Sequence, residues 1–211
     1  MRVAITFDNG PEPGVTEGVL DVLARYEIKA TFFVIGRKLE RPEGRRLVAR
    51  AAAEGHRIGN HTYTHTVALG RMDGRAAVDE ICRTQDLIER VSTERLFRPY
   101  GEGGGLGPHL LSPAARDHLA SHGFTCVLWN VVPGDWKDPE GWVDDAVAAC
   151  SIRNSPVLVL HDLPTGALRR LPTFLDRLKA LGAEMTQAFP DECVPIRAGV
   201  VAADCGRYVA R

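Results

Sequence analysis

Polar side chains able to act in catalysis or metal binding follow five apolar stretches of this 211-residue chain, where strands are expected to end. These residues are Asp8 and Asn9, His61 and His65, Arg98, Asp135, and His161. In folds with parallel strands, active sites form at the carboxyl ends of the strands. Taken singly, Asp8-Asn9-Gly10-Pro11 is equally well explained as a turn. Five such strand ends together favour one site over unrelated turns.

His61 and His65 form an HxxxH pair. On a helical turn, residues four apart share a face, so both imidazoles could bind one metal ion. Thr62 or Thr64 could hold the ring nitrogens or the loop in place, as metal sites require of their surroundings. The alternative is a coincidental spacing of two exposed histidines.

His161 follows the apolar run 156–160. An imidazole at this position suits a general acid, because its pKa lies near neutrality. A hydrogen-bonded core histidine is an equally good interpretation.

The glycine-rich loop 101–107 lacks the phosphate-binding pattern GxxxxGK[ST], which argues against a nucleotide site. We expect this loop to expose backbone N–H groups to a substrate.

Strand and helix patterns alternate along the chain. Strands are expected from Val3 to just before Asn9 and over 30–35, 56–59, 96–98, 125–130 and 156–160. Helices are expected over 16–26, with Thr16 as its cap, and over 43–54, 74–92, 112–122, 140–150 and 168–181. This alternation predicts a single α/β domain with a parallel sheet and helices outside, either open or closed as a barrel.

Composition excludes several functional classes. A net charge of −1 gives no electrostatic reason to expect nucleic acid or an anionic membrane as partner. The five cysteines are widely spaced without a CxxC, which predicts reduced, buried thiols. The first strand starts almost at Met1, without a leader pattern, and no apolar run is long enough for a membrane span. We therefore expect a cytoplasmic protein.

Taken together, these motifs resemble the polysaccharide deacetylase family, also called the NodB homology domain or carbohydrate esterase family 4. The resemblance extends from Thr6 to about Gly182. We expect residues 1–211 to form one such domain, with 190–211 as a C-terminal tail packed on it as loop and short strand. The five motifs appear in the order of the family, as Thr6-Phe7-Asp8-Asn9-Gly10-Pro11, Asn60-His61-Thr62-Tyr63-Thr64-His65, Phe97-Arg98-Pro99-Tyr100-Gly101, Asp135-Trp136 and Leu158-Val159-Leu160-His161-Asp162.

The resemblance implies a distorted (β/α) barrel of about seven parallel strands with helices outside. It also implies a metal-dependent hydrolase that removes an N-acetyl or similar N-acyl group from an amino sugar or oligosaccharide. One divalent ion is expected, zinc first, with cobalt or nickel as alternatives. By position, the ligands would be His61, His65 and Asn9. The other roles would be Asp8 as general base, His161 as general acid, Tyr100 as oxyanion donor through its backbone N–H, and Arg98 and Asp135 as orienting residues.

Two departures from the family pattern limit this transfer. Asn9 stands where the family has a metal-binding Asp, so a neutral amide replaces a carboxylate. Asn9 could still ligate, Asp8 could move onto the metal, or the site could be empty. The third motif is one residue short, so the substrate is less transferable than the reaction. A cytoplasmic location would favour an oligosaccharide or precursor over a polymer.

Two alternative functions stay open. One is a related deformylase or imide or amide hydrolase acting on a non-sugar molecule. The other is a catalytically impaired glycan-binding homologue, which Asn9 favours. The sequence predicts no oligomeric state.

Overall fold

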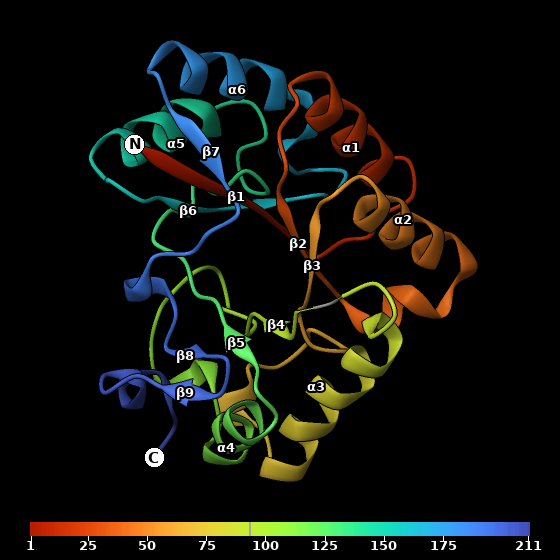
Figure 1. Cartoon of the computed structure of the whole chain (residues 1–211), viewed down its shortest axis with the longest axis vertical. Coiled ribbons are helices and arrows are strands. Elements are labelled where there is room, and N and C mark those ends of the chain that lie inside the picture. The colour runs from red at the N-terminus through yellow and green to blue at the C-terminus, as the bar shows by residue number, and fades with distance from the viewer. Residues whose placement is uncertain (93) are drawn as a thin grey trace.

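The computed structural model describes residues 1–92 and 94–211, in which a ring of strands lies inside a ring of helices (Figure 1). The parallel strands are β1 (Arg2–Asp8), β2 (Thr31–Val34), β3 (Arg57–Asn60), β4 (Leu96–Phe97), β5 (Thr125–Cys126), β6 (Val157–His161) and β7 (Glu184–Thr186). Their order is β6-β1-β2-β3-β4-β5, and β7 pairs with the first residues of β1. β1 therefore pairs with three parallel strands, β2, β6 and β7.

The ring closes through the segment that follows β5. Val127 N–H donates to the Phe97 carbonyl, and Val131 then forms a parallel bridge with Leu158 of β6. The strand expected over 125–130 is thus only two residues long as a regular strand, because the chain changes partners from β4 to β6. The predicted distorted (β/α) barrel is confirmed.

The helices follow one another around the outside of the barrel in the clockwise order α5, α6, α1, α2, α3, α4 in Figure 1. Their bounds are α1 (Thr16–Arg25), α2 (Pro42–Ala53), α3 (Gly74–Ile88), α4 (Pro113–Ser121), α5 (Trp142–Ser151) and α6 (Leu171–Ala180). Short 3₁₀ helices are η1 (Gly36–Glu40), η2 (Leu69–Arg71), η3 (Pro108–Leu110), η4 (Ala167–Arg169), η5 (Asp191–Cys193) and η6 (Cys205–Tyr208). None of the helices within 1–92 and 94–211 combines the length and apolarity needed to span a bilayer.

The expected helices are all present, with ends that differ by a few residues. The largest difference is at α3, which ends at Ile88 and not at residue 92. The expected capping role of Thr16 is wrong, because Val15 is the N-cap and Thr16 is the first helical residue. The Thr16 hydroxyl donates to Oδ2 of Asp162 at 2.6 Å, so it joins α1 to the end of β6.

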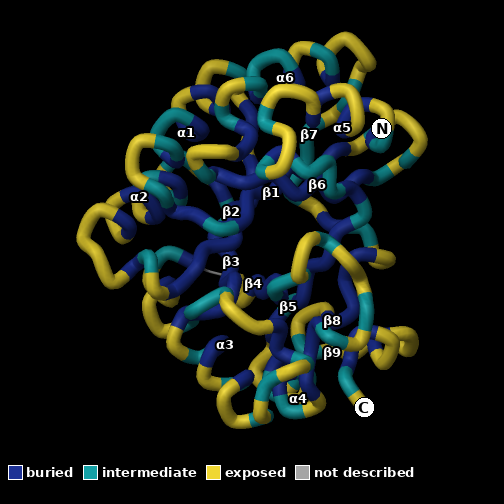
Figure 2. Tube along the Cα trace, turned by 180° about the vertical axis from the view of Figure 1, so that it is seen from behind, coloured by how far each residue is buried: buried dark blue, intermediate teal, exposed yellow. Residues whose placement is uncertain are grey.

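Burial explains the apolar runs. Residues 3–8 of β1 are all buried, and so is every residue of β2 and β6. Figure 2 shows the central strands as buried and the outer faces of the helices as exposed. A strand buried on both faces requires a continuous apolar run, which is the pattern that these segments have.

The last residues pack on the side of the barrel near α4. The strands β8 (Ile196–Arg197) and β9 (Val200–Val201) pair antiparallel, and β8 continues the sheet from β5. Leu111 forms a further bridge with Val209. All five cysteines are free thiols, and Cys82 is the one that is partly exposed.

Candidate active site

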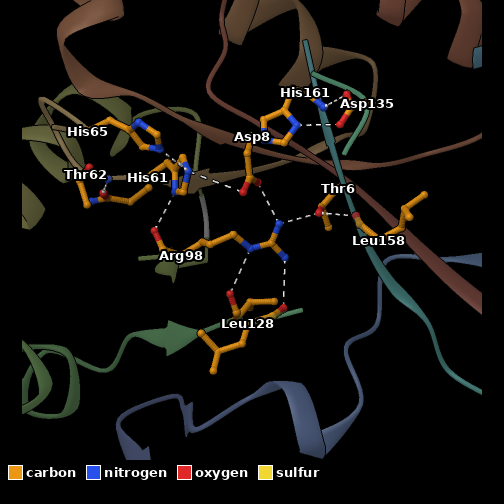
Figure 3. Close-up of polar contacts among 12 residues, drawn as sticks. Thr6, Asp8, His61, Thr62, His65, Arg98, Leu128, Asp135, Leu158 and His161 are labelled. Carbon is orange, nitrogen blue, oxygen red and sulfur yellow. Dashed lines mark hydrogen bonds and ion pairs between the residues drawn. The ribbon is translucent and has the colours of Figure 1, made fainter. Parts of the chain in front are cut away.

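The carboxyl ends of the strands lie level with one another and bring the candidate residues together (Figure 3). Asp8 pairs with His161 across β1 and β6, and Asn60 pairs with Phe97 across β3 and β4. His61 and Arg98 are the next residues along β3 and β4. The strand ends surround a pocket of about 200 Å³, and Arg98 is buried outside its lining. The pocket is lined by Asp8, Asn9, His61, His65, Pro99, Tyr100, Gly101, Gly103, Gly104, Trp129, Val132, Trp136, Val159, His161 and Leu163.

The two histidines of the HxxxH motif converge, but not on a helix. Thr62 and His65 have φ angles of 65° and 55°, so the segment is an irregular loop and the expected helical turn is wrong. The Nε2 atoms of His61 and His65 lie 3.1 Å apart. His61 donates from Nδ1 to the backbone carbonyl oxygen of Arg98 at 2.9 Å. This fixes the tautomer in which Nε2 of His61 carries a free lone pair toward His65.

Both imidazoles are in an environment that favours the neutral form. Burial lowers the pKa of His61, although the Asp8 carboxylate and the hydrogen bond to Arg98 oppose this. Burial, followed by the neighbouring His61, lowers the pKa of His65 to about 2. A metal ligand must be unprotonated, so both rings are held in their ligating state.

Asn9 is a third group that could bind a metal ion in this pocket. The residue lines the same pocket, with a left-handed backbone at φ 75°, and its buried Oδ1 has no hydrogen-bond partner within residues 1–92 and 94–211. Among the described residues, no group of three or more His, Cys, Asp or Glu side chains is placed to hold a metal ion. Two imidazole nitrogens and one amide oxygen fit zinc, cobalt or nickel, but the donor set carries no negative charge.

Arg98 holds Asp8 from inside the barrel. Its side chain is fully buried, and Nη1 donates to Asp8 Oδ1 at 2.9 Å and to Thr6 Oγ1 at 2.6 Å. Nε and Nη2 donate to the carbonyls of Val127 and Leu128. The other oxygen of Asp8, Oδ2, lies 3.6 Å from His61 Nε2. Asp8 is thus fixed beside the histidine pair with one oxygen facing it.

His161 is held by both oxygens of Asp135. Its Nδ1–H donates to Oδ1 at 2.9 Å and its backbone N–H donates to Oδ2 at 2.8 Å, while the Trp136 ring packs edge-on against it. Burial opposes the charged imidazole and is the largest single influence. The hydrogen bond and charge of Asp135, with the charges of Asp8 and Asp162, outweigh burial and raise the pKa of His161. His161 is therefore suited to carry a proton near neutral pH.

Tyr100 and the glycine-rich loop form the wall of the pocket that faces His65. The rings of Tyr100 and His65 have centroids 4.1 Å apart. Gly101 lies against the Trp129 ring and Gly104 against Val132, and the Trp129 indole N–H donates to the Gly104 carbonyl at 2.9 Å. The role of the Tyr100 backbone N–H as an oxyanion donor stays a prediction.

Sequence reasoning missed two residues around the site, Trp129 and Glu80. Trp129 is the second-to-last residue of the predicted strand 125–130, so its position near a strand end was the signal for it. Glu80 is a buried acid on the same side of α3 as the buried Ala77 and Ile81, and its carboxylate accepts hydrogen bonds from the HxxxH loop. A charged residue within an apolar stripe was the signal for it.

Comparison with known proteins agrees with this geometry. A family model described as polysaccharide deacetylase matches residues 1–127. The chain is 38% identical over 165 residues to the chitooligosaccharide deacetylase of Sinorhizobium fredii, over 76% of this chain and 71% of that protein. It is 30% identical over 187 residues to a peptidoglycan-N-acetylglucosamine deacetylase of Listeria monocytogenes, over 87% of this chain but only 37% of that protein.

Solved structures give the same result. A family 4 carbohydrate esterase from Streptomyces lividans in complex with acetate superposes with a TM-score of 0.75 at 28% identity, covering 92% of this chain and 95% of that one. A family 4 acetyl xylan esterase from Clostridium thermocellum in complex with a cobalt ion gives 0.71 at 27% identity, covering 88% and 87%. The predicted enzyme class is confirmed at the level of the family, because these relatives are deacetylases and esterases of that class. The chain belongs to the polysaccharide deacetylase family.

Proposed function

We propose that this chain is a metal-dependent hydrolase that removes an N-acetyl group from an amino sugar or a soluble oligosaccharide. One observation carries the proposal. A pair of neutral imidazoles and an Asp8 carboxylate lie in the same small pocket as a histidine that is held for protonation by Asp135. Amide hydrolysis needs these three functions together, namely an electrophilic centre, a base and an acid. The names of the relatives support a glycan substrate.

His61, His65 and Asn9 would hold the ion. A divalent cation bound there supplies Lewis-acid polarisation of the acetamide carbonyl. Zinc is the first choice for two imidazoles and an oxygen, and cobalt is supported by the cobalt ion in the Clostridium thermocellum relative.

The protein's own groups divide the proton transfers. Asp8, fixed by Arg98, accepts a proton from the attacking water through the carboxylate oxygen that faces the pocket. His161 donates its Nε2 proton to the leaving amine, and Asp135 stabilises the imidazolium before the transfer. The Tyr100 N–H would donate to the oxyanion of the tetrahedral intermediate.

Asn9 is the position at which the proposal is most easily tested. Its Oδ1 has no hydrogen-bond partner among the residues that the structure describes, which favours ligation through oxygen over an empty site or a shift of Asp8 onto the ion. The substitution Asn9→Asp adds a negative charge to the donor set and is expected to tighten zinc binding by roughly tenfold or more. Unchanged zinc affinity and rate would mean that position 9 is not a ligand.

A catalytically impaired glycan-binding homologue is the second candidate, because the donor set of His61, His65 and Asn9 is uncharged. Binding of an oligosaccharide without turnover, with metal supplied, would favour it. Hydrolysis confined to formylated amines or cyclic imides would instead favour the non-sugar hydrolase.

The deciding assay measures acetate released from N-acetylglucosamine oligosaccharides by protein loaded with zinc or cobalt. Formyl-amine and imide substrates are run in parallel, as is oligosaccharide binding by calorimetry. Acetate release by the wild type, and its loss in His161→Ala with metal still bound, is the result that the proposal predicts. Activity only on insoluble polymer would contradict the oligosaccharide substrate.

A further inference from the structure

The loop that carries His61 and His65 has no regular secondary structure of its own. It leaves β3 at Asn60, and two of its residues, Thr62 and His65, have a left-handed backbone conformation. Residues with a side chain seldom adopt this conformation. Nothing in the HxxxH spacing itself brings the two Nε2 atoms to 3.1 Å in this conformation. The contacts that define the loop must therefore come from outside it.

Glu80 of α3 supplies most of these contacts. Its side chain is 8% exposed, and Oε2 accepts from the backbone N–H groups of Tyr63 at 2.9 Å and Thr64 at 2.8 Å. Its other oxygen accepts from the Thr64 hydroxyl at 2.8 Å. One buried carboxylate thus satisfies two consecutive backbone donors between the histidines. Without an acceptor, buried N–H groups are costly, so the loop would turn them toward water.

Two other residues of α3, Ile81 and Arg83, also contact this segment of the chain. Asn60 donates from Nδ2 to the Ile81 carbonyl at 2.8 Å, and its Oδ1 accepts from the Thr62 N–H at 3.0 Å. The Arg83 guanidinium lies 3.5 Å from the centre of the Tyr63 ring. In Figure 1, α3 lies on the outside of the barrel next to β3, and the loop that follows β3 contacts this helix through Glu80.

We propose that Glu80 is a positioning residue, which fixes the loop so that His61 and His65 converge and thereby sets the affinity of the site for a divalent ion. The part of this proposal that concerns the ion rests on the proposed function. The part that concerns the loop does not, because the hydrogen bonds of Glu80 exist in the protein without metal. Outer partners of metal ligands typically change affinity by about 10- to 100-fold when they are removed.

Two substitutions at Glu80 and one control separate positioning from general stability. Glu80→Ala removes all three hydrogen bonds. Glu80→Gln keeps them, because its oxygen can accept both N–H groups and its NH₂ can donate to Thr64 Oγ1, whose proton turns to Thr66 Oγ1, 2.9 Å away. Ile88→Ala, at the buried end of the same helix, removes packing without removing a contact to the loop.

The first measurement is made on metal-free protein, with folding of each variant checked by circular dichroism. Hydrogen exchange should show protected Tyr63 and Thr64 amides in the wild type, Glu80→Gln and Ile88→Ala, and exposed amides in Glu80→Ala. A nuclear Overhauser contact between the His61 and His65 rings, whose centroids are 4.6 Å apart, should disappear only in Glu80→Ala. Unchanged protection and ring contact in Glu80→Ala would overturn the proposal.

The second measurement is zinc and cobalt affinity by titration calorimetry. Glu80→Ala should bind about 10- to 100-fold more weakly than the wild type, with Glu80→Gln and Ile88→Ala close to the wild type. Equal loss in Glu80→Gln, or in Ile88→Ala, would overturn positioning in favour of charge or overall stability. If the wild type binds no ion, the proposed function fails, and the exchange and ring-contact results alone decide the role of Glu80.

Discussion

Two kinds of histidine share one pocket, and they differ in what their second ring nitrogen faces. His61 donates from Nδ1 to an uncharged backbone carbonyl, whereas His161 donates from Nδ1 to the Asp135 carboxylate. Both residues are buried, at 3% and 8% exposure. Burial lowers the pKa of His61, but the carboxylate raises the pKa of His161. The partner of the second nitrogen therefore decides which imidazole has a lowered pKa and which has a raised pKa.

We propose that this difference divides the pocket into a metal side and a proton side. His61, His65 and Asn9 form the metal side, and His161 with Asp135 forms the proton side. Asp8 and Arg98 lie between them. If the division is correct, substitutions on one side should leave the function of the other side intact.

The largest effect is expected for His161→Ala. Loss of the general acid should lower kcat by about 10²- to 10⁴-fold. Zinc affinity should stay at the wild-type value, because His161 belongs to the proton side. Steady-state kinetics and titration calorimetry on the same preparation measure both quantities. A protein that loses its metal together with its activity would show that His161 is a ligand, and the division would be wrong.

Arg98→Met should damage both sides through stability. The substitution leaves the buried Asp8 carboxylate without its cation, which costs about 3–5 kcal/mol in the free energy of unfolding. Denaturant unfolding measures this cost. Arg197→Met is the matched control, since it breaks an exposed pair with Asp191 and should cost less than about 1 kcal/mol. Similar losses in the two variants would show that the buried pair is not structurally important.

Asp135→Asn should remove the charge on the proton side and keep one of its two hydrogen bonds. The amide oxygen can still accept from His161 Nδ1, whereas the amide NH₂ then faces the His161 backbone N–H, which is also a donor. The raised pKa keeps His161 protonated above its ordinary value of 6.5, and the protonated form is lost as pH rises through the raised value. Removing the Asp135 charge should therefore move the alkaline loss of kcat to lower pH. Rate profiles and NMR titration of His161 measure the shift. An unchanged alkaline limb would remove His161 from the role of acid.

Asp162→Asn should shift the pKa of His161 in the same direction by a smaller amount. Asp162 is the weakest of the carboxylates that raise the pKa of His161. Burial also raises the pKa of Asp162 itself to about 7, so at neutral pH it is only partly charged. The same NMR titration compares the two variants. A shift as large as that of Asp135→Asn would reassign the main electrostatic partner of His161.

Much of the fold could be predicted because its information is local. The apolar runs of β1, β2 and β6 identify strands buried on both faces, and their alternation with helices predicts a parallel sheet. The closure of the barrel could not be predicted residue by residue. It depends on a change of partner after β5: the chain pairs with β4 up to Val127, and Val131 then pairs with Leu158 of β6. No local sequence pattern specifies this change.

The candidate site divides in the same way. The polar residues at strand ends were identified from their position after apolar runs. The loop of His61 and His65 was predicted as a helical turn, since the spacing fits one, but its conformation depends on Glu80 from another element. The sequence around Thr16 predicts a helix cap, because the actual partner of its hydroxyl, Asp162, is 146 residues away and no local pattern identifies it.

The most direct test of the metal side is the metal content of protein purified without a chelator. Elemental analysis should find about one divalent ion per chain in the wild type, and none in the double variant His61→Ala, His65→Ala. The double variant must be folded, which circular dichroism establishes. An ion retained by the double variant would place the site elsewhere. A wild type that takes up no ion, even with added zinc, cobalt or nickel, would contradict the proposed mechanism.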